Sequence, residues 1–257
     1  MIAYDDHGHG HPTLVAIAGG AARHPDYLGD LAGLSAGHRL IRPHLRGVGR
    51  TPLTGGGSYR EQTPDLDDLR AGLGLDRMVL LAHSAGTRLA MHYAVRFPDR
   101  VAALVLITPP AADLVAVPSD AGELIAARAG DPVIDAAVAA RSTLHHDDAW
   151  WRVVAPLGYA RWGTVEREHA RVGEINFAAN QAFRMLDPPG DLTAVTAPVL
   201  VVAGAQDCLT GFEPVAALAG VFPRGELAVI EDCGHYPWVE QPAAFRRAVD
   251  AFLAQRV

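Results

Sequence analysis

The chain has 257 residues and a mass of 27.2 kDa, enough for one large domain or for a core with an insertion. Apolar residues make up 49% and charged residues 20% of the chain, so its composition excludes a disordered protein. The net charge of −7 argues against a nucleic-acid partner, and because all 22 basic residues are arginine, Schiff-base, pyridoxal-phosphate and P-loop chemistry are excluded.

Short apolar runs alternate with helical patterns along most of the chain. The runs expected to form strands are Thr13–Ala18, Arg39–Pro43, Met78–Ala82, Val101–Ile107, Val199–Ala203 and Leu227–Ile230. They are continuously apolar, as in strands covered on both faces of a parallel sheet. Helices are expected at Pro64–Leu73, with Thr63 as N-cap, and at Pro242–Leu253. This alternation predicts an α/β fold with a mostly parallel sheet and flanking helices.

The interval from Thr108 to Pro198 interrupts the alternation, because it holds helical patterns and no convincing strand. The helices expected there are Ala121–Arg128, Pro132–Arg141, Asp147–Val154 and Thr164–Met185. An insertion at the carboxyl end of a strand is placed to cover the crevice in which open α/β sheets bind ligands. We therefore predict a helical lid at residues 110–189 and a core made of residues 1–109 and 190–257.

The strand at Met78–Ala82 leads into His83-Ser84-Ala85-Gly86 and then a helix expected at Thr87–Phe97. A serine between small residues, at a sharp turn from strand to helix, is typical of a nucleophile elbow. A serine that only caps the helix would produce the same pattern. The segments that follow favour the nucleophile, because an acid and then a histidine come next in the order that this kind of triad requires.

The acid and the histidine each follow an expected strand. Asp207 comes after the strand that ends at Ala203, and His235 comes after the strand that ends at Ile230. Three residues in this order, each at a strand end, predict a catalytic triad of Ser84, Asp207 and His235. Backbone N–H groups of Gly20 and of Ala85 are the expected oxyanion hole, although Ala18-Gly19-Gly20-Ala21 also reads as a plain glycine-rich turn.

These motifs resemble those of the α/β-hydrolase family over nearly the whole chain. The matching segments are Gly8–Pro12 with Ala18–Gly20, Arg46–Thr51, Gly204–Asp207, and Gly234-His235 with Glu240 and Pro242. The resemblance implies an eight-stranded, mostly parallel sheet with a lid after its sixth strand and no cofactor. Because the N-terminus is short, we expect the family's first strand to be missing.

Within the family, the chain is most similar to the proline-iminopeptidase-like and small-esterase subgroup. It departs from the family pattern at Ala18, where a histidine is usual, and at His44, where an aspartate is usual. These departures weigh against a peptidase. Ser84 in place of an aspartate argues against the dehalogenase and epoxide-hydrolase relatives, whose nucleophile is a carboxylate.

Aromatic residues of the insertion and of the last segment are expected to divide between packing and an acyl pocket. The candidates for substrate binding are Trp150, Trp151, Trp162, Phe177 and Trp238. Glutamates Glu166, Glu168 and Glu174 are expected on solvated helix faces, with contact to a substrate amine as the alternative. An apolar or aromatic acyl substrate is therefore favoured.

The remaining polar clusters predict little chemistry of their own. Neither His7-Gly8-His9-Gly10-His11 nor His145-His146-Asp147-Asp148 has the spacing of a structural metal site, so no metal is expected. Reduced thiols are expected at Cys208 and Cys233, with a redox-sensitive pair as the alternative. The N-terminus lacks a signal-peptide pattern, and the longest apolar run is only strand length, which predicts a cytoplasmic protein without a membrane partner.

Three functions fit this pattern. The leading one is a serine hydrolase that cleaves a small ester, thioester or amide through a covalent acyl-enzyme. The second is a non-hydrolytic enzyme with the same triad, such as a lyase, cyclase or acyl transferase. The third is a ligand receptor without efficient turnover. The expected partner is a small acyl molecule in each case, and the sequence leaves the oligomeric state open.

Overall fold

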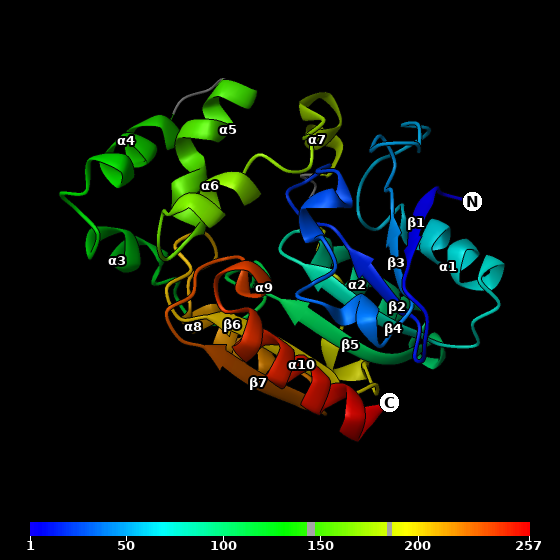
Figure 1. Cartoon of the computed structure of the whole chain (residues 1–257). Coiled ribbons are helices and arrows are strands. Elements are labelled where there is room, and N and C mark those ends of the chain that lie inside the picture. Colours follow the sequence, from blue (N-terminus) through cyan, green and yellow to red (C-terminus); the bar gives the residue numbers. More distant parts are fainter. Residues whose placement is uncertain (143–146, 184–186) are drawn as a thin grey trace.

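The computed structural model describes residues 1–142, 147–183 and 187–257, and a seven-stranded sheet forms its centre (Figure 1). The strands are β1 Tyr4–His7, β2 Leu14–Ile17, β3 Leu40–Pro43, β4 Met78–His83, β5 Val101–Ile107, β6 Val199–Gly204 and β7 Gly225–Ile230. They lie in the order β1-β3-β2-β4-β5-β6-β7, and only the β1–β3 pair is antiparallel. The prediction of a mostly parallel sheet is confirmed.

The edge strand β1 is the one that the hydrophobic pattern did not predict. Its sequence, Tyr-Asp-Asp-His, contains no apolar run, and all four side chains are half-buried or exposed. Backbone pairing holds it to β3, in a register that sets Tyr4 opposite Pro43. An ion pair of 2.7 Å between Asp6 and Arg39 adds to this pairing. Because an edge strand has one neighbour and an exposed side, pattern alone does not reveal it.

Helices cover both faces of the sheet. Those that follow core strands are α1 Thr63–Gly72, α2 Gly86–Arg96, α8 Glu213–Leu218, α9 Pro237–Glu240 and α10 Pro242–Arg256. Short 3-10 helices lie at Pro25–Leu28, Leu34–Ala36, Pro98–Arg100, Ala155–Gly158, Leu192–Ala194 and Ala219–Val221. Thr63 does not cap α1 but is its first residue, and its hydroxyl donates to the Arg60 carbonyl.

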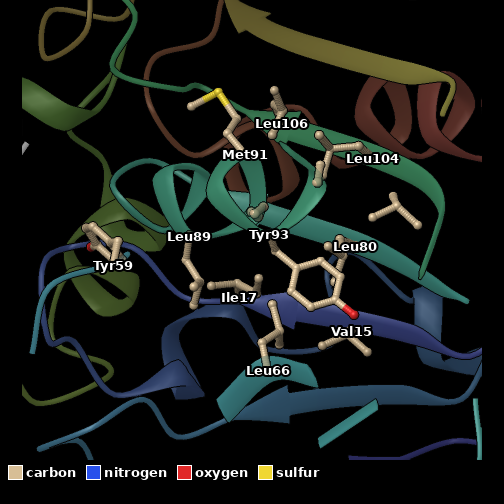
Figure 2. Packing of buried hydrophobic residues seen from close by; sticks show 14 of the residues in the cluster. Val15, Ile17, Tyr59, Leu66, Leu80, Leu89, Met91, Tyr93, Leu104 and Leu106 are labelled. Carbon is tan, nitrogen blue, oxygen red and sulfur yellow. The ribbon is translucent and has the colours of Figure 1, made fainter. Parts of the chain in front are cut away.

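Alternate residues of the strands β2 to β6 enter two different apolar layers. On one face, Val15 and Leu80 pack in a cluster with Leu66 of α1 and Leu89 of α2, as Figure 2 shows. On the other face, Leu14 belongs with the residues of α10 to a second cluster. Alternation of side chains along a strand distributes a continuous apolar run between the two layers.

The chain between β5 and β6 is helical in its described part, with α3 Ala121–Ala126, α4 Pro132–Arg141, α5 Asp148–Val154, α6 Thr164–His169 and α7 Phe177–Phe183. Figure 1 shows α3 to α6 grouped beyond the carboxyl end of β5, with α7 set apart toward β1–β3. The prediction of one helix at Thr164–Met185 is wrong. Gly173, at φ 79°, lies between α6 and α7, and a residue with left-handed φ interrupts a helix. The end of that predicted helix lies outside the described residues.

Among the described helices, none combines the length and the apolar character that crossing a bilayer requires.

Candidate active site

Ser84 lies at the turn between β4 and α2 with φ 50°, a backbone conformation that non-glycine residues seldom adopt. Its N–H donates to the Ile107 carbonyl at the end of β5, at 2.9 Å, and its side chain is half-buried. The loop after β2 approaches this turn closely, because a Cβ at Gly19 would lie 2.4 Å from the His83 carbonyl oxygen. The strand, a serine with positive φ and the helix follow one another as in a nucleophile elbow, and the role of Ser84 as nucleophile stays a prediction.

Asp207 and His235 form a buried pair. The Oδ2 atom of Asp207 lies 2.7 Å from Nδ1 of His235, and the two residues are 1% and 3% exposed. The hydroxyl of Thr210 donates to the same carboxylate at 2.6 Å, and the Leu209 N–H donates to its other oxygen at 2.9 Å. Burial alone would raise the pKa of Asp207, but the charge and hydrogen bond of His235 hold it below its ordinary value.

The backbone of His235 is fixed on both sides. Its N–H donates to the Gly158 carbonyl at 2.8 Å, and its carbonyl accepts from the Thr108 hydroxyl at 3.1 Å. The same carbonyl lies 2.9 Å from Nε2 of His83, the residue before Ser84. Within the part of the chain that the structure describes, no hydrogen bond joins Ser84 Oγ to the His235 ring. Such bonds are commonly long before a substrate is bound.

The two expected oxyanion donors lie on either side of the elbow. Gly20 has φ 68° in the loop after β2, and Ala85 is the N-cap of α2. Among the described residues, neither backbone N–H has a hydrogen-bond partner. The Gly19 N–H, by contrast, donates to the Tyr27 hydroxyl at 2.6 Å. Gly20 and Ala85 therefore keep donors available to a developing negative charge, as an oxyanion hole requires.

The five aromatic candidates occupy different places. Trp238 is 6% exposed and packs edge-on to the His83 ring at 4.8 Å between centroids. Trp162 packs on Tyr159, and the Trp150 indole N–H donates to the Ala140 carbonyl of α4.

The other two aromatic candidates line two cavities, one within the insertion and one at its border with the core. Trp151 lines one of about 480 Å³. Phe177 lines another of about 420 Å³, together with Ala22 and His24. Neither of these two cavities is lined by two of the five candidates, although Trp151, Trp162 and Trp238 contact the same apolar cluster, so their role toward a substrate stays a prediction.

Arg23 joins the loop after β2 to the insertion. It is 2% exposed, and its Nη2 donates to the Val172 carbonyl at 2.6 Å. The guanidinium lies 4.1 Å from the Tyr27 ring centroid and 5.2 Å from that of Trp151. Hydrogen bonds to backbone carbonyls and stacking on two rings hold this buried cation in place. The insertion is thereby attached directly beside the expected oxyanion loop.

Several residues around the pair were not predicted from the sequence. Tyr27 and His83 form a hydrogen bond of 2.8 Å behind the elbow. Glu240, five residues after His235, accepts backbone hydrogen bonds on both sides of that histidine. The bond from the Leu209 N–H to the Asp207 carboxylate had a local signal, because aspartates in turns often accept from a backbone N–H two residues later.

The remaining candidates for chemistry are scattered. In the described ranges, no three histidine, cysteine or acidic side chains form a group that could hold a metal ion, while His145 and His146 lie outside those ranges. Cys208 and Cys233 are both buried and free. Glu166 accepts from the Gly163 N–H at 2.8 Å and so caps the start of α6.

Comparison with known proteins identifies the family of the chain. Residues 12–242 match the family model for the alpha/beta hydrolase fold. The chain is 27% identical, over 98% of its length and 90% of the relative's, to the 2-hydroxy-6-oxononadienedioate/2-hydroxy-6-oxononatrienedioate hydrolase 1 of Dechloromonas aromatica (strain RCB). It is 30% identical, over 98% of its length and 96% of the relative's, to a proposed carbamate hydrolase, RutD, of Variovorax paradoxus (strain S110).

A solved structure of a thermophilic esterase from Thermogutta terrifontis superimposes with a TM-score of 0.71. It shares 23% sequence identity and covers 99% of this chain and 93% of the esterase. This likeness shows a common fold. Because the family model spans most of the chain and the relatives are hydrolases, the chain belongs to the α/β-hydrolase-fold family and is an enzyme.

Proposed function

We propose that the protein is a cytoplasmic serine hydrolase that cleaves a small ester, thioester or amide through Ser84, His235 and Asp207. The observation that carries this proposal is the buried hydrogen bond of 2.7 Å between Asp207 and His235. The carbonyl of His235 in turn lies 2.9 Å from the ring of His83, the neighbour of the strained Ser84. A base oriented by an acid beside a strained serine is the arrangement that activates a hydroxyl nucleophile.

The chemistry follows from the orientation of the imidazole. Because the Nδ1–H of His235 donates a hydrogen bond to the Asp207 carboxylate, the Nε2 atom of His235 keeps a lone pair and takes the proton of Ser84 Oγ. The oxygen then attacks the acyl carbonyl, and the proton passes to the leaving alcohol, thiol or amine. Water, deprotonated by the same histidine, cleaves the acyl-enzyme and restores the serine.

The negative charge on the acyl oxygen would be held by the N–H groups of Gly20 and Ala85. Loss of one such donor typically costs about 3 to 4 kcal/mol of transition-state stabilisation. The segment 110–189 would act as the lid, since Arg23 attaches it beside this loop. Its aromatic residues Trp150, Trp151, Trp162 and Phe177, with Trp238, would favour an apolar acyl group through packing at the lid and beneath it.

The test is intact-mass analysis after treatment with a fluorophosphonate probe, on wild type, Ser84→Ala and Ser142→Ala. Ser142 is an exposed serine of the insertion whose hydroxyl donates to the Ala139 carbonyl. We expect one adduct on wild type and on Ser142→Ala and none on Ser84→Ala. Ester turnover by Ser84→Ala should fall by at least about 1,000-fold, because the triad acts as a unit.

The same proteins decide between the competing functions. A substrate panel includes simple esters, thioesters and amides, a carbamate, and 2-hydroxy-6-oxononadienedioate, which is named in a relative's activity. Products formed only with an added nucleophile would indicate an acyl transferase. A folded wild type that takes no adduct and turns over nothing, yet gains thermal stability with a ligand, would overturn the hydrolase proposal in favour of a receptor.

A further inference from the structure

We propose that Tyr27 and His83 are a positioning pair that ties the oxyanion loop, the nucleophile elbow and the histidine loop together through one directed chain of hydrogen bonds. The chain runs from the Gly19 N–H to the Tyr27 hydroxyl, on to the His83 ring, and from there to the His235 carbonyl. The inference rests on the proposed function, since it assigns its two residues to the same site.

The three contacts are short. The Gly19 N–H lies 2.6 Å from the Tyr27 oxygen, and that oxygen lies 2.8 Å from Nδ1 of His83. Nε2 of His83 lies 2.9 Å from the His235 carbonyl oxygen. Gly19 lies in the loop after β2, His83 is the last residue of β4, and His235 lies in the loop after β7, so the chain of bonds joins three strand ends that are distant in the sequence. Tyr27 itself comes from the 3-10 helix Pro25–Leu28 on one face of the sheet.

The direction of every bond is determined by its partners. A carbonyl oxygen only accepts, so Nε2 of His83 carries a hydrogen and donates it to His235. Burial holds the pKa of His83 well below its ordinary value, so the ring is neutral and Nδ1 keeps a lone pair. The Tyr27 hydroxyl must then donate to Nδ1, and its oxygen accepts from Gly19. This assignment of protons satisfies all four groups.

Burial makes the chain sensitive to a single missing atom. Tyr27 and His83 are both 2% exposed, and rings surround them: Tyr27 packs near Tyr236 and Trp238, and His83 near His235. Water therefore has no route to replace a lost partner. Removing the Tyr27 hydroxyl leaves the Gly19 N–H and the His83 Nδ1 unpaired, and Gly19 directly precedes the expected oxyanion donor Gly20. If that loop shifted, the Gly20 N–H would lie farther from the negative charge of the transition state. The contacts that other residues make with the bound substrate would not change.

The experiment compares Tyr27→Phe with Tyr93→Phe. Tyr93 is also fully buried, and its hydroxyl donates to Asp67 at 2.9 Å, but it lies among Leu66, Leu80 and Leu104 on the opposite face of the sheet (Figure 2). Each substitution removes one buried hydroxyl and one oxygen atom. Both variants are thus expected to lose free energy of unfolding, but only Tyr27 lies beside the turn that carries Ser84.

The measurements are the rate of fluorophosphonate labelling of Ser84, the melting temperature, and kcat and KM on a p-nitrophenyl ester. We expect Tyr27→Phe to lower kcat and the labelling rate by about tenfold or more with KM within about twofold, because mispositioning a donor weakens the transition state. Tyr93→Phe should stay within about twofold of wild type in the labelling rate, kcat and KM. Wild-type kinetics in Tyr27→Phe, or an equal loss in both variants, would overturn the inference.

If Tyr27→Phe does not fold, His83→Gln is the second variant that tests the inference. Its amide carries the donor and the acceptor on one carbon at the end of a flexible chain, so it does not hold them at the positions of the two ring nitrogens that bond to Tyr27 and to the His235 carbonyl. The same fall in kcat at unchanged KM is expected, and wild-type kinetics would overturn the inference. Wild type that takes no adduct at Ser84 would overturn the proposed function itself. Wild type that labels normally beside an equally reactive Tyr27→Phe would overturn only the positioning role.

Discussion

Glu240 shows how one side chain holds the candidate histidine in place. Its carboxylate accepts from the N–H groups of Gly234 at 3.1 Å and Tyr236 at 3.2 Å, the two neighbours of His235. It also accepts from the Ala160 N–H in the insertion at 2.7 Å. Burial raises the pKa of Glu240 to about 7, although these hydrogen bonds act in the opposite direction. One acid thus links the histidine loop with the helical insertion.

The raised pKa of Glu240 predicts a pH-dependent stability. Between pH 4.5 and pH 7 the folded state keeps a proton that the unfolded chain releases, so the stability contributed by Glu240 falls as the pH rises. Relative to Glu240→Gln, the wild-type free energy of unfolding should fall by about 3 kcal/mol across this window. Urea unfolding of both proteins at pH 5, 6, 7 and 8 checks this. Parallel pH profiles would show that Glu240 does not titrate there.

The elbow between β4 and α2 depends on a close contact between elements. At Gly86, the first residue of α2, an added Cβ would lie 2.3 Å from the Ala18 carbonyl oxygen of the loop after β2. At Gly19 in that loop, an added Cβ would lie 2.8 Å from the Cβ of Ser84. These small residues let the loop after β2 lie directly against the turn that carries Ser84. The spacing of the candidate oxyanion donors therefore depends on backbone contact between two elements.

Substituting Gly86 tests this contact against a matched helical glycine. Gly86→Ala is expected to lower the free energy of unfolding by about 1 to 3 kcal/mol, because backbone atoms must move to admit the methyl group. Gly122 in α3 has no atom within 4 Å of an added Cβ, so Gly122→Ala should be neutral or stabilising by up to about 1 kcal/mol. Denaturant unfolding measures both. Equal effects of the two substitutions would contradict the close-contact argument.

Across the whole molecule, buried histidines make the free energy of unfolding depend on pH. The pKa values of His44, His83, His92 and His169 all lie below the ordinary value because burial penalises the charged ring. His169 shows how the polar bonds are arranged, with its ring nitrogens 2.7 Å from the Tyr159 hydroxyl and 2.8 Å from the Tyr27 carbonyl. At a pH below the ordinary pKa of histidine, these rings therefore stay neutral in the folded state, whereas the same histidines are protonated in the unfolded chain.

The free energy of unfolding is therefore expected to fall as the pH drops from 6.5 toward 4. In this window the unfolded state binds more protons, so stability rises with pH, which is opposite in sign to the contribution of Glu240. Burial lowers the pKa of His169 to about 4, which corresponds to about 3 kcal/mol from this residue alone. Urea unfolding from pH 7 to pH 4 should show a shallower slope for His169→Gln. An unchanged slope would assign the acid sensitivity to the other histidines.

The sequence alone predicts the parts of this protein whose signals are local. The run Val101–Ile107 forms a strand that begins and ends at the predicted residues, because a strand covered on both faces must be apolar throughout. The acid and the histidine were placed after strands that prove to be neighbours, β6 and β7. Carboxyl ends of parallel strands lie at one edge of a sheet, so order along the chain was sufficient to bring Asp207 and His235 together.

Tertiary structure decided the parts without a local signal. The polar edge strand Tyr4–His7 exists because β3 offers it backbone partners, and the predicted helix Thr164–Met185 is interrupted around Gly173. The bond between His83 and the His235 carbonyl joins residues 152 positions apart, and no spacing in the sequence foretells it. Sequence pattern thus determined the strands β2 to β7, because these follow from local hydrophobicity, and the order of the reactive residues can be read from the chain directly. The hydrogen bonds that aim those residues depend on which loops the folded sheet brings into contact.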